Sequence, residues 1–468
     1  MDDHFGDLLS NFDLHPSEEE TAQPSKRRIW PPRTAKHPKT YSSADCLAAI
    51  RGQRLPNRGL DLDVTRCSIV RGIRYHDDFG EELRGVLPMF TRALNARMIM
   101  SDMIPDMSDV DEFPYCIWHP DVAQENTYRE LAQRYPQMKY LVGRACAVGG
   151  YLDLYKELDI LPEVHIAEEA RENKPTGAAI FELLMSSPCR YEVMNDYTRS
   201  INAENPRPLA QLNGDTAVLA FLNTKNMPEK HFNYHGPYFN ITEDMGLDEF
   251  STEYYAPGSW SCGYESMELD PLRTALLYNP LPFDLPTIQK DVLILMAAYN
   301  GDIDRYSRLR RPRMIKKERN CVVRGIYHNT LFAKWWSLQL EIEAPYRNAD
   351  SHIRMAIEAS FIMNNDISRS IDGKSELPYL IYFPTPASSI TYEVLAAYEP
   401  RMLVQIARAC IVANYESLFD KLDPPPDACL LVEAEICLGH HGNIILFMNC
   451  VRIIWLIHSG TQVPGTLI

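Results

Sequence analysis

The segment GRACAVGGYLDLYKELD (Gly143–Asp159) has a counterpart in ARACIVANYESLFDKLD (Ala407–Asp423), at an offset of 264, the difference between 143 and 407. The alignment runs without a gap over Pro114–Asp159 and Pro378–Asp423, where about 19 of 46 positions are identical. This similarity is far above chance, so the chain carries an internal repeat. A repeat architecture predicts that function resides in a surface more than in a chemical pocket.

Working outward from this repeat, we predict two related helical units, module A (residues 61–175) and module B (residues 286–438). Both open with VRGI, and ALNARMIM at Ala93 matches AIEASFIM at Ala356 with apolar residues at helical spacing. The predicted fold class is therefore mostly α, with irregular ankyrin-like helical repeats in two duplicated modules and a middle insert.

The repeated segment of each module predicts the same order of secondary-structure elements. PYCIWHP at Pro114 and PYLIYFP at Pro378 place prolines around an aromatic run, which indicates an extended connector. The sequence that follows predicts a helix, a proline break and two more helices. Thr127 and Thr391 are the expected N-caps, because a hydroxyl can accept from a free backbone N–H of the first turn.

The rest of the chain has less pattern. Residues 1–60 are polar and proline-rich and predict a disordered arm. Residues 176–285 form a middle segment, with an aromatic, Gly/Pro-rich loop from FNYHGPYFNITEDMG to YYAPGSWSCGY. Residues 439–468 are an apolar tail, for which we expect a buried or ill-defined terminal helix, with a tail anchor as the alternative.

Composition narrows the classes of function. The formal charge of −16 argues against general nucleic-acid binding, and no membrane association is expected apart from the tail-anchor alternative. Eleven cysteines without a CxxC pair indicate reduced, mostly buried thiols in a cytoplasmic protein. The short basic run Lys26–Arg28 leaves nuclear import as an alternative location.

Three segments share one helix-pair pattern: AAYNGDIDRYSRL at Ala297, ACAVGGYLDLYKEL at Ala145 and ACIVANYESLFDKL at Ala409. Small residues let the first helix pack closely, and we expect Gly301, Gly149 or Ala413 to close it. The pattern resembles the inner part of an ankyrin repeat, without its TPLH opening and without the usual spacing of about 33 residues.

Longer stretches extend the resemblance. VRGIYHNTLFAKWW, IMNND and LPYLIYFPTPAS together resemble a family of large fungal ankyrin-like proteins of unassigned function. The resemblance implies helical repeats and an intracellular setting, and it implies no catalytic residue and no cofactor. We therefore expect an interaction or scaffold protein, with an enzyme or accessory protein of fungal specialised metabolism as the alternative.

A basic stripe before the second VRGI is the main local charge anomaly. In an acidic chain such a stripe predicts docking of an acidic protein partner, or else pairing with acids elsewhere in the same chain. The adjacent tryptophan pair predicts either core packing or an interface anchor. The candidate binding residues are Arg305, Arg308, Arg310, Arg311, Arg313, Lys316, Lys317, Trp335 and Trp336.

The enzyme alternative depends on two weak motifs. Asp77, Asp78 and Glu81 have the form DDxxE, and Asn364, Ser368 and Asp372 have the form NxxxSxxxD. Together they resemble the magnesium-binding motifs of class I terpene synthases, although their separation is too long for that family's helical core. We expect no metal site here. The common nucleotide-binding, hydrolase and metalloprotease motifs are absent from the sequence.

Overall fold

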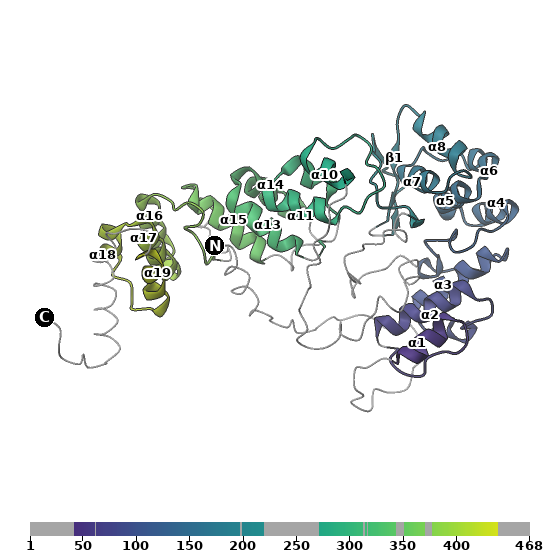
Figure 1. Cartoon of the computed structure of the whole chain (residues 1–468), viewed down its shortest axis with the longest axis horizontal. Helices are drawn as coiled ribbons and strands as arrows, with labels where there is room; N and C mark the ends of the chain where they lie inside the picture. The colour runs from purple at the N-terminus through teal and green to yellow at the C-terminus, as the bar shows by residue number, and fades with distance from the viewer. Residues whose placement is uncertain are drawn as a thin grey trace. The chain divides into compact units, whose positions relative to one another are not determined.

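The computed structural model describes residues 42–60, 62–196, 199–219, 271–311, 314–315, 317–342, 351–369 and 377–438. These ranges are mostly helical, as predicted (Figure 1). The predicted loop at 232–264 and the apolar tail at 439–468 lie outside them. None of the helices described is both long and apolar enough to cross a lipid bilayer.

The first half of the chain begins with helices and ends with short strands. Its elements are α1 (Ser43–Ile50), α2 (Asp63–Tyr75), η1 (Glu81–Leu83), α3 (Pro88–Met100), η2 (Val110–Glu112), α4 (Glu125–Arg134), η3 (Pro136–Met138), α5 (Lys139–Gly149), α6 (Leu152–Glu157), α7 (Val164–Glu172), α8 (Ala178–Met185), β1 (Tyr191–Glu192), β2 (Met194–Asn195), β3 (Ser200–Ile201) and β4 (Arg207–Pro208). β1 pairs with β4 and β2 with β3, both antiparallel.

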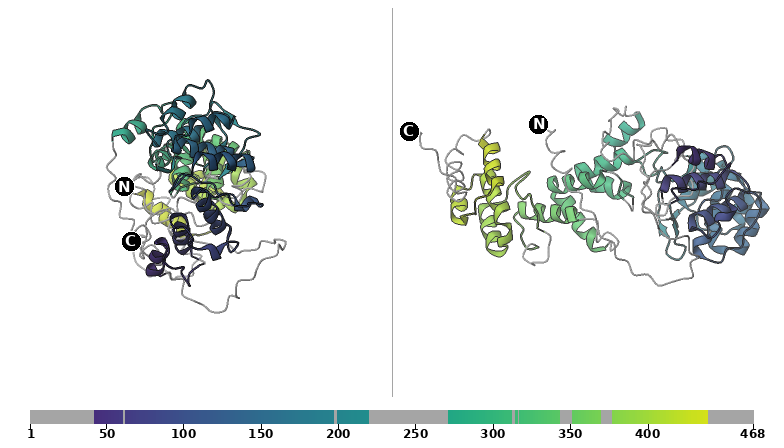
Figure 2. Two further views of the ribbon diagram at one scale, coloured as in Figure 1. Left: turned by 90° about the vertical axis from the view of Figure 1, so that its right-hand side faces the viewer. Right: turned by 90° about the horizontal axis from the view of Figure 1, so that it is seen from below.

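In the second half, the regular secondary structure of the described residues consists of helices (Figure 2). Its elements are α10 (Pro271–Tyr278), α11 (Asp291–Asn300), α12 (Ile303–Leu309), α13 (Glu318–His328), α14 (Thr330–Ile342), α15 (Ser351–Met363), α16 (Ser389–Tyr398), η9 (Pro400–Met402), α17 (Leu403–Ala413), α18 (Glu416–Leu422) and α19 (Ala428–Leu438).

The core residues fall into four clusters along the chain. α1–α3 enclose one, and α3–α8 with the strands that follow enclose a second. α10–α15 enclose a third, and α15–α19 enclose a fourth. Each cluster is built by helices that present apolar side chains on one face, which is how stacked helical units share a continuous interior.

The order of elements after the connector is the same in the two modules. α4, η3 and α5 begin and end at residues that lie 264 before the bounds of α16, η9 and α17. α6 and α18 begin at the same offset, and so do α7 and α19. The predicted helix, proline break and helix pair are therefore confirmed in both places.

The hydrogen bonds around the connector also recur. In both modules, a tyrosine of the first helix donates to a carbonyl of the connector at 2.7 Å. A second tyrosine, which lies after the next helix, donates to another carbonyl at 2.9 Å in both modules. The donor and acceptor pairs are Tyr128 on Ile117 and Tyr151 on Ala123 in module A, and Tyr392 on Ile381 and Tyr415 on Ala387 in module B.

The glycine of each VRGI element lies against the backbone of another helix. A Cβ on Gly72 of α2 would lie 2.1 Å from the carbonyl oxygen of Ala49 in α1. A Cβ on Gly325 of α13 would lie 2.1 Å from the carbonyl oxygen of Ala298 in α11. The backbones touch because both glycines lack a side chain, so the two VRGI elements serve the same close helix contact.

The structure corrects the predicted arm. Ser43–Ile50 lies within the segment assigned to disorder, yet it forms α1, with Cys46 and Ala49 buried against α2. Eight residues span little more than two turns, which is too short for a clear apolar period. The helix is held by tertiary contact instead of by its own propensity. Residues 1–41 lie outside the described ranges.

The predicted helix ends are partly wrong. Gly301 closes α11 in the left-handed conformation, as expected. However, the residues that close α5 and α17 are Gly150 and Asn414, not Gly149 and Ala413. Each helix runs one residue further than predicted. In α17 the reason is that asparagine adopts a positive φ more readily than alanine does, whereas α5 offers two successive glycines and closes at the second.

The predicted N-caps are also wrong. Thr127 and Thr391 lie inside the first turns of α4 and α16, and the N-caps are Gln124 and Ser388. The threonine hydroxyls instead donate to the side chains of Asp102 and Asn365, at 2.8 and 2.7 Å. These acceptors follow α3 and α15 and have φ values of 61° and 65°. The two threonines therefore tie the end of α3 to α4 and the end of α15 to α16.

Candidate interaction site

The arginines at the start of the basic stripe bind backbone carbonyls within the chain. Arg305 donates to the carbonyl oxygens of Leu276 and Asn279, at the C-terminal end of α10. Arg308 donates to the carbonyl oxygen of Phe283. Free carbonyls at a helix end are natural acceptors for a cation, so these two side chains stabilise the local fold.

Arg311 forms part of a charge network with acids elsewhere in the chain. Its guanidinium lies 2.7 Å from a carboxylate oxygen of Asp215 and 2.7 Å from one of Asp291. The ammonium of Lys290, which is fully buried, lies 3.1 Å from the second oxygen of Asp215. The network joins the segment around residue 215 to α11, as the within-chain alternative predicted.

The tryptophan pair packs chiefly into the interior. Trp336 is 3% exposed, and Trp335 is half-buried against Tyr306 and Phe332. The guanidinium of Arg310 lies 5.2 Å from the Trp335 ring centroid, within cation–π range.

Of the remaining residues of the basic stripe, the structure describes Lys317 but not Arg313 or Lys316. Lys317 is exposed and precedes α13, with a φ of 66°. Arg313 and Lys316 lie outside the described ranges. Docking of an acidic partner on the stripe thus stays a prediction, while the contacts of Arg305, Arg308 and Arg311 account for much of its charge.

Module A contains a buried charge cluster that the sequence did not reveal. Arg144 of α5 is fully buried and donates to Asp196 at 2.6 Å and to Glu169 of α7 at 2.9 Å. Tyr115 donates to the same oxygen of Asp196 at 2.7 Å, and the guanidinium lies 4.6 Å from the Trp118 ring. Two carboxylates and an aromatic face replace the water that this cation loses on burial.

Glu163 at the N-cap of α7 and Glu168 within α7 accept hydrogen bonds from backbone N–H groups. Glu163 caps α7 by accepting from the backbone N–H groups of His165 and Ile166, at 2.8 and 3.0 Å. Glu168 accepts from the backbone N–H groups of Gly214 and Thr216, at 2.7 and 3.0 Å. The outer side of α7 is therefore sealed by the chain that runs from β1 to residue 218.

Neighbouring carboxylates also set the pKa of the His165 imidazole, which is only 3% exposed. Burial by itself would lower the pKa of this imidazole, but the negative charges of Glu163 and Asp196 outweigh that effect and raise the pKa to about 10. The Nδ1 atom of His165 lies 2.7 Å from a Glu163 oxygen. His165 is therefore protonated at neutral pH and neutralises part of the acidic cluster.

This pair makes the stability of module A depend on pH. The folded-state pKa lies above the ordinary value of 6.5, so the stabilisation is complete below that value and is lost as the pH rises through about 10. We expect the difference in unfolding free energy between the native chain and His165→Gln to be largest near pH 6 and to shrink toward pH 10. Urea unfolding across this range measures it, and a constant difference would contradict the assignment.

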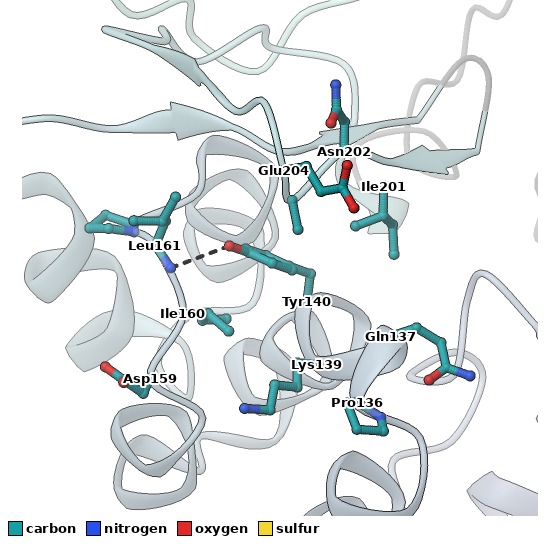
Figure 3. Close-up of a pocket in the computed structure, with 12 residues that line it drawn as sticks. Pro136, Gln137, Lys139, Tyr140, Asp159, Ile160, Leu161, Ile201, Asn202 and Glu204 are labelled. Carbon is teal, nitrogen blue, oxygen red and sulfur yellow. Dashed lines mark hydrogen bonds between the residues drawn. The ribbon is translucent and has the colours of Figure 1, made fainter.

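The open hollow in Figure 3 lies beside this cluster, between the start of α5, the loop after α6 and the segment after β3. Its volume is about 700 Å³, and its charged lining residues are Lys139, Asp159 and Glu204. Tyr140 accepts a hydrogen bond from the Leu161 backbone N–H at 3.4 Å, which holds the loop against α5. The lining side chains define the shape of the hollow, and the Tyr140 hydrogen bond stabilises the backbone of the loop after α6.

The residues of the predicted metal motifs make other contacts. Asp77 pairs with Arg97 at 2.7 Å and accepts from Ser101, whereas Asn364 bonds Thr330 and the Ser360 carbonyl. Asp372 lies outside the described ranges. In the part of the chain that the structure covers, no group of three or more His, Cys, Asp or Glu side chains is placed to hold a metal ion.

An exposed apolar row on α16 distinguishes module B. Ile390, Val394 and Tyr398 lie on one helix face, four residues apart, and their exposed fractions are 71, 36 and 64%. At the offset of 264, α4 carries Asn126, Glu130 and Arg134, which are also exposed. The same face of the same helix is thus polar in module A and apolar in module B.

The comparisons with known proteins are limited. Residues 118–221 match the family model described as the YKP1 C-terminal domain, which covers less than half of the chain. The matched range begins within the connector and ends after β4, so it contains Arg144, Glu169 and Asp196 of the buried charge cluster, while Tyr115 lies just before it. No curated protein and no solved structure matches the chain.

Proposed function

We propose that the chain is a protein-interaction protein that carries one ankyrin-like helical unit twice and binds its partner through the second copy. The exposed apolar row on α16, defined by Ile390, Val394 and Tyr398, carries the proposal. Exposed apolar residues that form a contiguous row on one helix are typical of interaction surfaces. The equivalent helix α4 has polar residues there, so the helical unit itself does not require the row.

Two further observations support the copied unit. The bounds of α4, η3 and α5 and the starts of α6 and α7 have counterparts at a single offset, and the tyrosine hydrogen bonds agree in partner and length. Left-handed closing residues end the first helix of all three ankyrin-like pairs, at Gly150, Gly301 and Asn414. A unit that keeps its interior while it changes one surface is the expected outcome when only that surface acquires a binding role.

The partner that fits the row is an amphipathic helix. Residues four apart on α16 match the apolar spacing that a second helix presents. Covering the exposed parts of the three side chains stabilises a complex by roughly 3 kcal/mol, at about 2 kcal/mol for each fully buried side chain. The free thiols among the described cysteines fit a reducing compartment such as the cytoplasm, where we place the protein.

The test gives α16 the residues of α4. We expect the variant I390N/V394E/Y398R of the full chain to recover its identified partners at least tenfold less well in quantitative affinity capture. The three positions are exposed, so the fold should tolerate the change. Leu331→Asn, which alters a residue of α14 that is 72% exposed and outside the α16 row, serves as the control. Equal recovery by the triple variant and the native chain would overturn the proposal.

A further inference from the structure

Module B repeats most of the buried charge cluster of module A. Arg408 of α17 lies at the offset of 264 from Arg144, and its guanidinium contacts Glu433 of α19 at 2.6 Å. Glu433 has the place of Glu169 in α7. The aromatic neighbours recur too, because Tyr379 and Tyr382 stand at the positions of Tyr115 and Trp118, with ring centroids 4.8 and 5.5 Å from the guanidinium.

The repeat lacks one component among the residues described. In module A, the Nη1 atom of Arg144 donates to Asp196, which comes from the turn between β2 and β3. The Nη1 atom of Arg408 is buried, and within the described part of the chain it has no hydrogen-bond partner. A buried guanidinium N–H without an acceptor is unfavourable, and a carboxylate at this place would supply the acceptor.

The residues around Arg408 are more exposed to solvent than their equivalents around Arg144 in module A. Tyr379 is 58% exposed, whereas Tyr115 is 6% exposed beneath the covering strands. The outer side of α19 is exposed as well, with Val432 at 52% and Ile436 at 62%. Val432 stands at the position of Glu168, whose carboxylate accepts from the backbone of Gly214 and Thr216, in the segment after β4.

The sequence after α19 does not supply the missing acid. Residues 439–468 contain neither Asp nor Glu, and glycine stands at position 460, the offset equivalent of Asp196. A segment that covers this surface of module B, as the Asp196 turn covers module A, therefore needs a carboxylate to pair with Arg408 and apolar groups to contact Val432 and Ile436.

We propose that Tyr379, Arg408, Val432 and Ile436 form a docking face for an acidic segment of a partner protein, in which one Asp or Glu lies beside apolar residues. The segment occupies the place that the Asp196 turn has in module A. This inference rests on the proposed interaction function and names the chemistry of the partner. A single carboxylate gives the face its selectivity, because a neutral amide leaves the guanidinium charge without a counterion.

The chain itself supplies a probe. A fluorescent peptide with the sequence of residues 190–203, RYEVMNDYTRSINA, carries Asp196 beside Val193 and Met194. We expect it to bind the full-length chain in an anisotropy titration, and we expect an Asp196→Asn peptide to bind at least tenfold more weakly. The tethered copy of this segment keeps the face of module A filled, so binding reports on module B.

Variants of the protein locate the binding. Arg408→Gln should weaken peptide binding at least tenfold, and so should Tyr379→Ala, an exposed position where a folding defect is not expected. Arg401→Gln, at a residue with a side chain that is 61% exposed on η9, should leave binding unchanged. Circular dichroism checks that each variant is folded.

Three results would overturn the inference: equal binding of the Asp and Asn peptides, no binding of the Asp peptide, or binding that appears only after residues 1–40 are removed. The last would mean that an Asp or Glu from residues 1–40 of the same chain fills the face. Failure here leaves the α16 row untouched, and failure of the α16 swap leaves peptide binding intact, so the two proposals fail separately.

Discussion

Arg144→Gln is expected to destabilise module A by about 3–5 kcal/mol, the usual cost of removing one partner from a buried ion pair. The substitution leaves Asp196 and Glu169 buried, each with a side chain 1% exposed, and without their cation. Because a domain has only about 5–15 kcal/mol of stability, the loss is a large part of the total. Urea unfolding followed by circular dichroism measures it.

The equivalent change in module B is the matched control. Arg408 and Glu433 have side chains that are 14 and 13% exposed, so water remains near the pair. We expect Arg408→Gln to cost less than Arg144→Gln, about 1–2 kcal/mol, because the pair is partly exposed and the substitution also removes the Nη1 atom, which has no hydrogen-bond partner among the described residues. The double variant R144Q/D196N should regain part of the loss, since it removes one of the unpaired charges. If Arg144→Gln and Arg408→Gln lowered the unfolding free energy equally, the result would contradict the argument that the deeper burial of the Arg144 pair makes it more important for stability.

The second large effect is expected at the two VRGI glycines. A Cβ at Gly72 or Gly325 would lie 2.1 Å from a backbone oxygen of the neighbouring helix, so the two helices would have to separate. Alanine improves helix propensity by about 1 kcal/mol, but overpacking of this kind costs about 1–3 kcal/mol, and contact with rigid backbone belongs at the upper end. We expect net losses of about 2 kcal/mol for both Gly72→Ala and Gly325→Ala.

Gly143→Ala provides the control for this pair. A Cβ at Gly143 would meet only the side-chain ends of Ile160 and Ile166, at 2.8 Å, and these can move. Module B already has alanine at the equivalent position, Ala407. Gly143→Ala should therefore change the unfolding free energy by less than about 1 kcal/mol. A large loss at Gly72 with none at Gly325 would contradict the equivalence of the two helix contacts.

The local helical order was predictable because it depends on short-range sequence. The proline break and the aromatic connector recur at one offset, so the elements from α4 to α6 and from α16 to α18 could be placed from the repeat alone. α1 could not, because Ala49 is buried by its contact with Gly72 and not by an apolar period of its own. Helix ends were misplaced by one residue where Gly150 and Asn414 take the left-handed conformation.

The candidate site was harder to predict, because its groups come from distant parts of the chain. The basic stripe is conspicuous in sequence, yet Arg311 pairs with Asp215, which no local pattern indicates. Arg144 was overlooked because Asp196 and Glu169 are remote in sequence. One signal was available: RAC recurs at Arg144 and Arg408, and a charged residue kept inside two apolar helices indicates a buried partner.

Equivalent distances within the two modules test the copied unit most directly. Gln133 and Lys156 are exposed on α4 and α6, and Ala397 and Asp420 are their offset equivalents on α16 and α18. Spin labels on genetically encoded residues at each pair report the spacing of these helices by pulsed electron resonance. The copied unit predicts coincident distance distributions for the two pairs. Clearly different distributions would mean that the modules do not share one backbone, and the case for a specialised second copy would fail with it.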